Sequence, residues 1–265
     1  MEITGTLDKM RTELKDRVHY FLQLGKDEIP MNEFIGKSIQ LQATGSIFCT
    51  VCGRKTNKSF GQGFCYPCFM NSPENSECIV KPELCKGHLG EGRDPEWEKK
   101  NHVQPHYVYL ALSSDVKVGV TRNTQIPTRW IDQGASAAII LAEVPYRQLA
   151  GEIEVFLKNY LPDKTNWQRM LKNEIAQGID LSERKSAAAA LMPEHLRPYI
   201  FPDNSITEIH FPVIEFPQKV KSVSLEKAGT IGGTLKGIKG QYLLFENGIV
   251  TNIRNQSGYE INLSA

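Results

Sequence analysis

The 265-residue sequence lacks three features, and each absence excludes a class of protein. It contains no uninterrupted apolar run that approaches the roughly 18 residues of a membrane helix. Its start, Met1-Glu2-Ile3-Thr4-Gly5, has neither the basic nor the apolar region of a secretory signal peptide. With 21 glycines and 14 prolines it also has too little of either residue for a low-complexity chain. We therefore expect a folded, soluble, cytoplasmic protein with no membrane partner.

The sequence also has no large excess of positive or of negative charge. The 31 Lys and Arg residues face 30 Asp and Glu residues, which gives a formal net charge of +1. This balance neither requires a nucleic-acid partner nor excludes one that docks on a local basic patch. Evidence for such a partner must come from motifs.

Cysteine is missing from most of the chain. All six cysteines lie between Cys49 and Cys85, so they cannot form disulfides that crosslink the whole fold. Cys49-x2-Cys52 and Cys65-x2-Cys68 form two knuckles separated by twelve residues. Each knuckle directs two thiolates at one metal ion, and two knuckles complete the tetrahedral shell that zinc prefers. We predict a closed, structural zinc site, because iron, which uses similar knuckles, is less typical without other cofactor motifs.

A second, incomplete ligand set follows the first. Cys78 is followed by Cys85 and His88, and the last two have the two-residue spacing of a knuckle. His102 or His106 would supply the fourth ligand, and we favour His102 because His106 adjoins a strand. We therefore predict a second closed zinc site, which would also be structural.

The two ends of the chain contain similar runs of residues. Gly5-Thr6-Leu7 and Ile39-Gln40-Leu41 near the start resemble Gly233-Thr234-Leu235 and Ile261-Asn262-Leu263 near the end. The spacing between the runs drifts by several residues, so the duplication is weak. It predicts that both ends of the chain belong to one β-rich unit.

The predicted fold class is α+β, with a zinc-ribbon segment, an α/β unit that has a small antiparallel sheet, and a β-rich unit formed by the two ends. The predicted segments are an N-terminal β segment (1–48), a zinc-binding cysteine-rich segment (49–102), the α/β unit (103–178), a helix and connection (179–218) and a C-terminal β segment (219–265).

Within the α/β unit, the apolar pattern predicts strands over residues 106–112 and 116–121 and a short helix over 128–132. A third strand over 137–144 and an amphipathic helix over 146–161 follow. The order is strand, strand, helix, strand, helix.

This order, with Tyr-Val-Tyr in the first strand and Lys-Val-Gly in the second, resembles the GIY-YIG nuclease superfamily. Tyr109 and Gly119 fall on the tyrosine of the first motif and the glycine of the second. Arg129 and Glu154 fall on the arginine of the first helix and the metal-binding glutamate. Lys117 replaces the tyrosine that opens the second motif, which indicates a degenerate copy. The whole chain is also similar to a bacterial family that places a cysteine-rich region before such a unit.

The resemblance implies phosphodiester cleavage. Glu154 would hold a Mg²⁺ ion, Tyr109 would assist deprotonation of water, and Arg129 with Lys117 or Arg122 would bind the phosphate. We therefore expect a zinc-containing protein that acts on nucleic acid, DNA or RNA, as a Mg²⁺-dependent endonuclease. The alternative is a catalytically inactive module that binds nucleic acid or protein, which Lys117 and Val120 favour.

Overall fold

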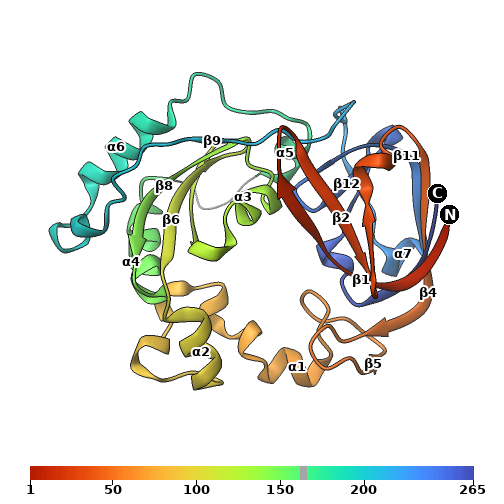
Figure 1. The fold of residues 1–265 in the computed structure, drawn as a ribbon, viewed down its shortest axis with the longest axis horizontal. Coiled ribbons are helices and arrows are strands. Elements are labelled where there is room, and N and C mark those ends of the chain that lie inside the picture. The colour runs from red at the N-terminus through yellow and green to blue at the C-terminus, as the bar shows by residue number, and fades with distance from the viewer. Residues whose placement is uncertain (162–165) are drawn as a thin grey trace. The chain divides into compact units, whose positions relative to one another are not determined.

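The computed structural model describes residues 1–161 and 166–265, and these residues form two compact units (Figure 1). Unit 1 contains residues Met1–Met70 and Ile209–Ala265, and unit 2 contains Asn71–Glu208. The mixed α+β architecture confirms the predicted fold class. The cysteine-rich segment predicted over 49–102 is divided between the units, because its first four cysteines belong to unit 1 and its last two to unit 2.

Unit 1 is built on a ten-stranded sheet. Along the sheet the strands follow the order β10-β13-β12-β11-β4-β14-β1-β2-β3, and β5 pairs with β4. The strands are β1 (Glu2–Leu14), β2 (Val18–Leu24), β3 (Asp27–Pro30), β4 (Ser38–Phe48), β5 (Lys55–Thr56), β10 (Lys221–Ser222), β11 (Thr230–Lys239), β12 (Tyr242–Phe245), β13 (Ile249–Asn252) and β14 (Tyr259–Ser264). The helical pieces are α1 (Tyr66–Asn71), which continues one residue past the unit boundary, α7 (Leu225–Ala228), η1 (Met31–Phe34), η8 (Glu246–Gly248) and η9 (Arg254–Gln256).

The strand order of unit 1 is symmetric about the β4–β14 pair. Strands β1 to β4 correspond to β11 to β14, and each fourth strand pairs with the first strand of the other repeat. Leu41 and Leu263, which the sequence match makes equivalent, lie directly opposite each other in the register. Both leucines are fully buried. The predicted duplication is therefore confirmed, and the exchange of fourth strands explains why both ends of the chain belong to one sheet.

The equivalent glycines of the two repeats also occupy equivalent positions. Gly5 lies opposite Ile261, and Gly233 lies opposite Ile39. The drift in spacing arises in the first hairpin of each repeat, since β1 runs to Leu14 and β11 is shorter. The duplication was weak in the sequence because this hairpin differs in length.

Unit 2 contains a four-stranded antiparallel sheet in the order β7-β6-β8-β9. Its strands are β6 (His106–Leu112), β7 (Val116–Arg122), β8 (Ala137–Val144) and β9 (Thr207–Glu208). Its α-helices are α2 (Pro95–His102), α3 (Thr128–Asp132), α4 (Arg147–Leu157), α5 (Trp167–Leu171) and α6 (Leu181–Leu191). Short 3₁₀ helices connect them: η2 (Pro73–Asn75), η3 (Glu77–Ile79), η4 (Pro82–Leu84), η5 (Gly87–Leu89), η6 (Asn123–Gln125) and η7 (Glu194–Tyr199).

The predicted strands and helices of the α/β unit are present in unit 2 with small changes at their ends. Helix α3 and strand β8 have the predicted bounds, whereas α4 ends at Leu157 rather than at residue 161. Leu149, Ile153 and Leu157 of α4 are spaced by about one turn and pack into a core with the sheet. Among the described residues, no helix combines the length and the apolar character needed to cross a membrane.

Candidate metal centres and the polar site of unit 2

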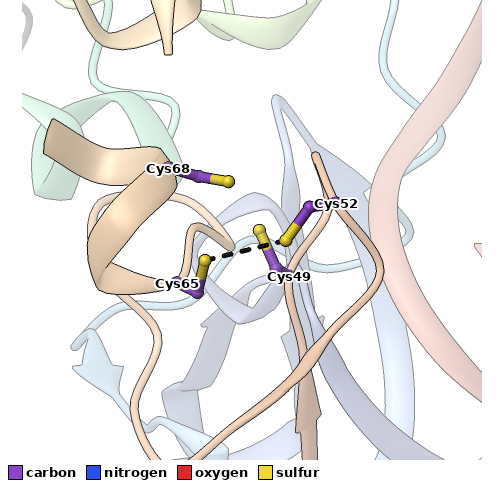
Figure 2. Close-up of side chains that lie close together, drawn as sticks. All are labelled: Cys49, Cys52, Cys65 and Cys68. Atoms are coloured by element: carbon purple, nitrogen blue, oxygen red, sulfur yellow. Dashed lines mark hydrogen bonds between the residues drawn. The ribbon is translucent and has the colours of Figure 1, made fainter. Parts of the chain in front are cut away.

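The first four cysteines converge in unit 1 (Figure 2). Cys49 directly follows strand β4, and Cys65 directly precedes helix α1, which contains Cys68. All four sulfur atoms lie within 4.8 Å of one another, and the Sγ atoms of Cys52 and Cys65 are 3.7 Å apart. This confirms the predicted group as one that can hold a metal ion.

Backbone hydrogen bonds shape the knuckles that carry these sulfurs. The amide of Gly53 donates to the carbonyl of Cys49 at 2.9 Å, and the amide of Cys49 donates to the carbonyl of Arg54 at 2.9 Å. Gly53 has a φ of 71°, a conformation that glycine adopts at little cost. The amide of Thr50 donates to the carbonyl of Gly63 at 2.9 Å, which joins the two knuckles.

The thiols of this group differ in pKa, because burial, backbone amides and the neighbouring thiols act on each of them to a different extent. Burial alone would raise the pKa of Cys49, but backbone amides, led by that of Cys52, outweigh it and lower the pKa to about 6. Burial and then the neighbouring thiols raise the pKa of Cys68 to about 12. Four thiolates can coexist at this spacing only when a cation balances their charge.

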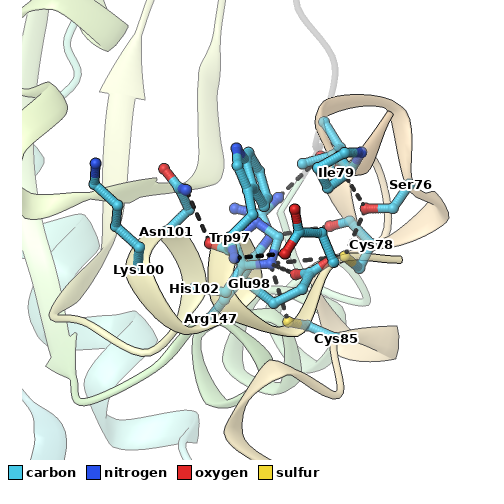
Figure 3. Close-up of polar contacts among 12 residues, drawn as sticks. Ser76, Cys78, Ile79, Cys85, Trp97, Glu98, Lys100, Asn101, His102 and Arg147 are labelled. Carbon is cyan, nitrogen blue, oxygen red and sulfur yellow. Dashed lines mark hydrogen bonds and ion pairs between the residues drawn. The ribbon is translucent and has the colours of Figure 1, made fainter. Parts of the chain in front are cut away.

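A second group forms in unit 2 from Cys78, Cys85, Glu98 and His102 (Figure 3). Cys78 lies in η3 and Cys85 directly follows η4, while Glu98 and His102 are one turn apart on α2. The Nδ1 atom of His102 is 3.4 Å from the sulfur of Cys85 and 3.9 Å from that of Cys78, and it also forms an ion pair with Glu98. All four side chains are buried. This group too can hold a metal ion.

The composition of the second group differs from the predicted one by a single residue. His88 lies outside it, and its ring stacks on Tyr146 with the centroids 4.6 Å apart. Glu98 takes its place because helix α2 brings residues four apart onto one face. The sequence contains the signal for this helix, since Asp94 accepts a hydrogen bond from the amide of Trp97 as its N-cap.

Helix α4 anchors the loop that carries Cys78. Arg147, which sequence reasoning missed, donates hydrogen bonds of 2.9 Å to the carbonyl oxygens of Cys78 and Ile79. A Cβ atom at Gly151 would lie 2.1 Å from the amide nitrogen of Glu83, so α4 contacts the backbone of η4 directly. Arg147 and Gly151 therefore position the second group without belonging to it.

His106, the alternative fourth ligand, is a buried residue outside both groups. Its Nδ1 lies 2.7 Å from the carbonyl oxygen of Gln104, which fits a neutral ring that donates from this nitrogen. Burial disfavours the charged ring and lowers the pKa of His106 to about 3.

The four predicted catalytic residues all belong to unit 2. Tyr109 is fully buried on the central strand β6 and donates to Oε1 of Gln133 at 2.9 Å. Burial raises the pKa of its hydroxyl, and a hydrogen bond and the charge of Arg129 oppose this rise. Glu154 is close enough for its charge to raise the pKa of Tyr109 further. Arg129 and Glu154 are therefore close enough to act electrostatically on Tyr109.

Tyr109, Lys117 and Glu154 are largely enclosed rather than open to a solvent-accessible cleft. Lys117 points to the same face of the sheet as Tyr109, because it pairs with Ala111, two residues along β6. It is 6 % exposed and lies inside the unit rather than at a rim. Glu154 has 12 % of its side chain exposed and forms an ion pair of 3.4 Å with Lys158, and burial raises its pKa.

One comparison identifies a family for the chain. A family model with the description "Protein of unknown function (DUF2797)" matches residues 36–261. The chain belongs to the DUF2797 family. No curated protein and no solved structure matches it. The predicted membership of the GIY-YIG superfamily is wrong, because the family model that spans most of the chain is that of DUF2797.

Packing accounts for Gly119, one of the residues that carried the mistaken resemblance. A Cβ atom at Gly119 would lie 2.6 Å from the hydroxyl of Tyr109, so close contact with this ring requires glycine. In this DUF2797 chain Gly119 therefore has a structural role.

We expect the native protein to hold two equivalents of divalent metal. Cys65→Ser and Cys85→Ser should each remove one equivalent, because they delete a ligand from different groups. Each variant should also melt at a lower temperature. Elemental analysis and calorimetry measure both effects, and Asn57→Ala, an exposed change between the knuckles, is the control. A full metal content in both cysteine variants would contradict the assignment.

Because His106 is buried as a neutral ring, we expect the protein to lose stability in acid. Its pKa falls from 6.5 in the unfolded chain to about 3 in the folded one, so its contribution is complete above pH 6.5 and declines as the pH falls toward 3. The decline is about 1 kcal/mol per pH unit. Urea unfolding of the protein and of His106→Gln should give free energies of unfolding that run parallel above pH 7 and change their difference steadily as the pH falls from 6.5 toward 3. Parallel curves throughout would show that His106 is not a buried neutral base.

Proposed function

We propose that this DUF2797 protein is a zinc-containing protein that binds nucleic acid. The binding surface is the metal hairpin, which we define as residues 49–70 with the first cysteine group at its base. The observation that carries the proposal is the combination, on this one segment, of aromatic rings, basic side chains and no acidic residue.

The donor atoms of both groups favour zinc. Four thiolates form a closed tetrahedral shell, and two thiolates with an imidazole and a carboxylate form a mixed shell of the same size. Thiolates are poor ligands for magnesium or calcium, which prefer oxygen atoms. Cys49, Cys52, Cys65 and Cys68 would hold one zinc ion, and the ion would fix the hairpin in shape.

Three aromatic rings of the hairpin form a cluster. The centroids of Phe60 and Tyr66 are 5.4 Å apart, and those of Phe60 and Phe69 are 5.8 Å apart. Tyr66 is 57 % exposed, which leaves a rigidly supported ring open to solvent. Exposed aromatic rings of this kind stack on unpaired bases with little regard to sequence.

Three cations belong to the same hairpin, and one of them lies over a ring of the cluster. Arg54, Lys55 and Lys58 are exposed, and the Nζ atom of Lys58 lies 5.5 Å from the centre of the Phe60 ring. A zinc ion with four thiolates carries a net charge of about −2, so the three cations leave the hairpin positive overall. Positive charge beside an open ring is the combination that binds the backbone and the bases of a single strand.

The hairpin should therefore bind single-stranded nucleic acid. We expect Tyr66→Ala to weaken binding by about 1–3 kcal/mol, which is the usual value of one stacked base. Replacing Arg54, Lys55 and Lys58 together by Gln should flatten the dependence of log Kd on log salt by about 2. Fluorescence anisotropy with labelled single-stranded DNA, RNA and duplex DNA measures both effects.

Lys26→Gln is the matched control for the charge change, because Lys26 is exposed in unit 1 but outside the hairpin. It should leave the salt dependence unchanged. Variants that bind as tightly as the native protein, or a native protein that binds none of the three probes, would refute the proposal.

Cleavage of nucleic acid at the Tyr109 site of unit 2 is a second candidate function. The neighbouring positions of Tyr109, Arg129 and Glu154 favour it, since they place a cation, a carboxylate and a hydroxyl in one region. Arg129 would bind a phosphate, and Glu154 would hold a divalent cation such as Mg²⁺ that neutralises developing charge. The burial of Tyr109 and Lys117 means that substrate could reach only Arg129 and Glu154 directly.

A cleavage assay separates this candidate from simple binding. We expect Glu154→Gln to abolish any Mg²⁺-dependent cleavage of plasmid, single-stranded DNA or RNA, with the melting temperature nearly unchanged. Neutral glutamine is tolerated because burial already disfavours the charged carboxylate. Glu152→Gln on the same helix is the control and should cleave normally, since Glu152 pairs with His195 instead. A native protein that cleaves none of these substrates would end the second candidate.

A further inference from the structure

A cavity of about 300 Å³ adjoins the second cysteine group of unit 2. Cys78 and Glu98 belong to its lining, together with Gly92 and Arg93. Gly92 lies against the Glu98 side chain, because a Cβ atom there would lie 2.4 Å from Cγ of Glu98. The cavity thus gives small molecules a route to one side of the group.

The four ligands are not equivalent with respect to this cavity. Cys78 and Glu98 line it, whereas Cys85 and His102 do not. Thiolates and imidazole bind zinc or cobalt more firmly than a carboxylate does, since they are softer donors. Of the two ligands that face the cavity, the carboxylate of Glu98 is therefore the one that exchanges most easily.

We propose that the second centre is an accessible metal site, in which Glu98 exchanges with a small anion that enters through this cavity. Cys78, Cys85 and His102 remain bound and hold the metal in place. In the exchange, the bond from the metal to the Glu98 oxygen breaks and a bond from the metal to the anion forms. Three protein ligands with one exchangeable position are the arrangement of reactive rather than structural zinc sites. The sequence alone had indicated a closed site.

Arg93 supplies the positive charge that the exchange requires. Its Nη1 donates a hydrogen bond of 2.9 Å to the carbonyl of Ser72, and within the described part of the chain its guanidinium forms no ion pair. Lys86, the other cation of the lining, is paired with Glu91 at 3.3 Å. Arg93 is therefore the cation that balances the extra negative charge when an anion and the released Glu98 share the cavity.

Cobalt replacement with azide as the anion tests this site in the full-length protein. Cobalt(II) bound by thiolates has visible absorption bands that depend on every ligand. We expect azide to change these bands in a saturable way, and Arg93→Gln to weaken azide binding at least threefold. Glu98→Gln should bind azide at least tenfold more tightly, because the competing carboxylate is gone. Glu96→Gln, an exposed change on the same helix, should behave as the native protein does.

Two further variants assign the response to the second centre. Cys65→Ser should keep the azide response and Cys85→Ser should lose it, because only the second centre faces the cavity. Cobalt bands that azide does not alter, or a response that survives Cys85→Ser, would overturn the proposal. So would a protein that takes up only one equivalent of cobalt. Since Arg93 is not a ligand, its variant tests the proposal even where Glu98→Gln fails to fold.

Discussion

The packing of six thiol groups into two small volumes is the constraint on which both units depend. Sulfur atoms as close as 3.7 Å cannot all carry negative charge in a partly buried site unless a cation lies among them. The same holds in unit 2, where two thiols, a carboxylate and an imidazole, all on buried residues, approach one another. A divalent ion at each group would turn mutual repulsion into attraction. The ligands come from loops, short 3₁₀ helices and two short α-helices, so bound ions would help to hold these segments in shape.

Each unit connects its centre to a sheet in a different way. In unit 1 the first knuckle continues directly from β4, the strand that also contributes to the symmetric β4–β14 pair. In unit 2 the centre rests on α4, which holds the Cys78 loop through Arg147 and contacts η4 at Gly151. The chemistry proposed for each centre follows from this difference. We propose that the first centre stiffens an exposed hairpin that carries aromatic and basic side chains, whereas the second lies against a cavity through which it can meet a ligand.

Local patterns in the sequence predicted much of this structure, and contacts between distant residues explain where the predictions failed. The Cys-x2-Cys knuckles determined the first group, because a knuckle brings its two sulfurs together without help from the rest of the fold. The strands and helices of unit 2 followed from apolar periodicity. Glu98 was missed because its position depends on a short helix whose charged sequence shows no apolar face. The motif glycine misled because Gly119 serves a contact with the Tyr109 ring, which sequence spacing does not reveal.

The central claim is that two different metal centres organise the cysteine-rich segment. X-ray absorption at the zinc edge of the metal-loaded protein tests it most directly, because it counts the atoms bound to the metal. Four sulfurs at one centre and two at the other predict an average of about three sulfur atoms and one nitrogen or oxygen atom per zinc ion. The zinc to sulfur distance should be about 2.3 Å. A spectrum dominated by nitrogen and oxygen, or a protein whose cysteines are joined in disulfides and hold no zinc, would contradict the account.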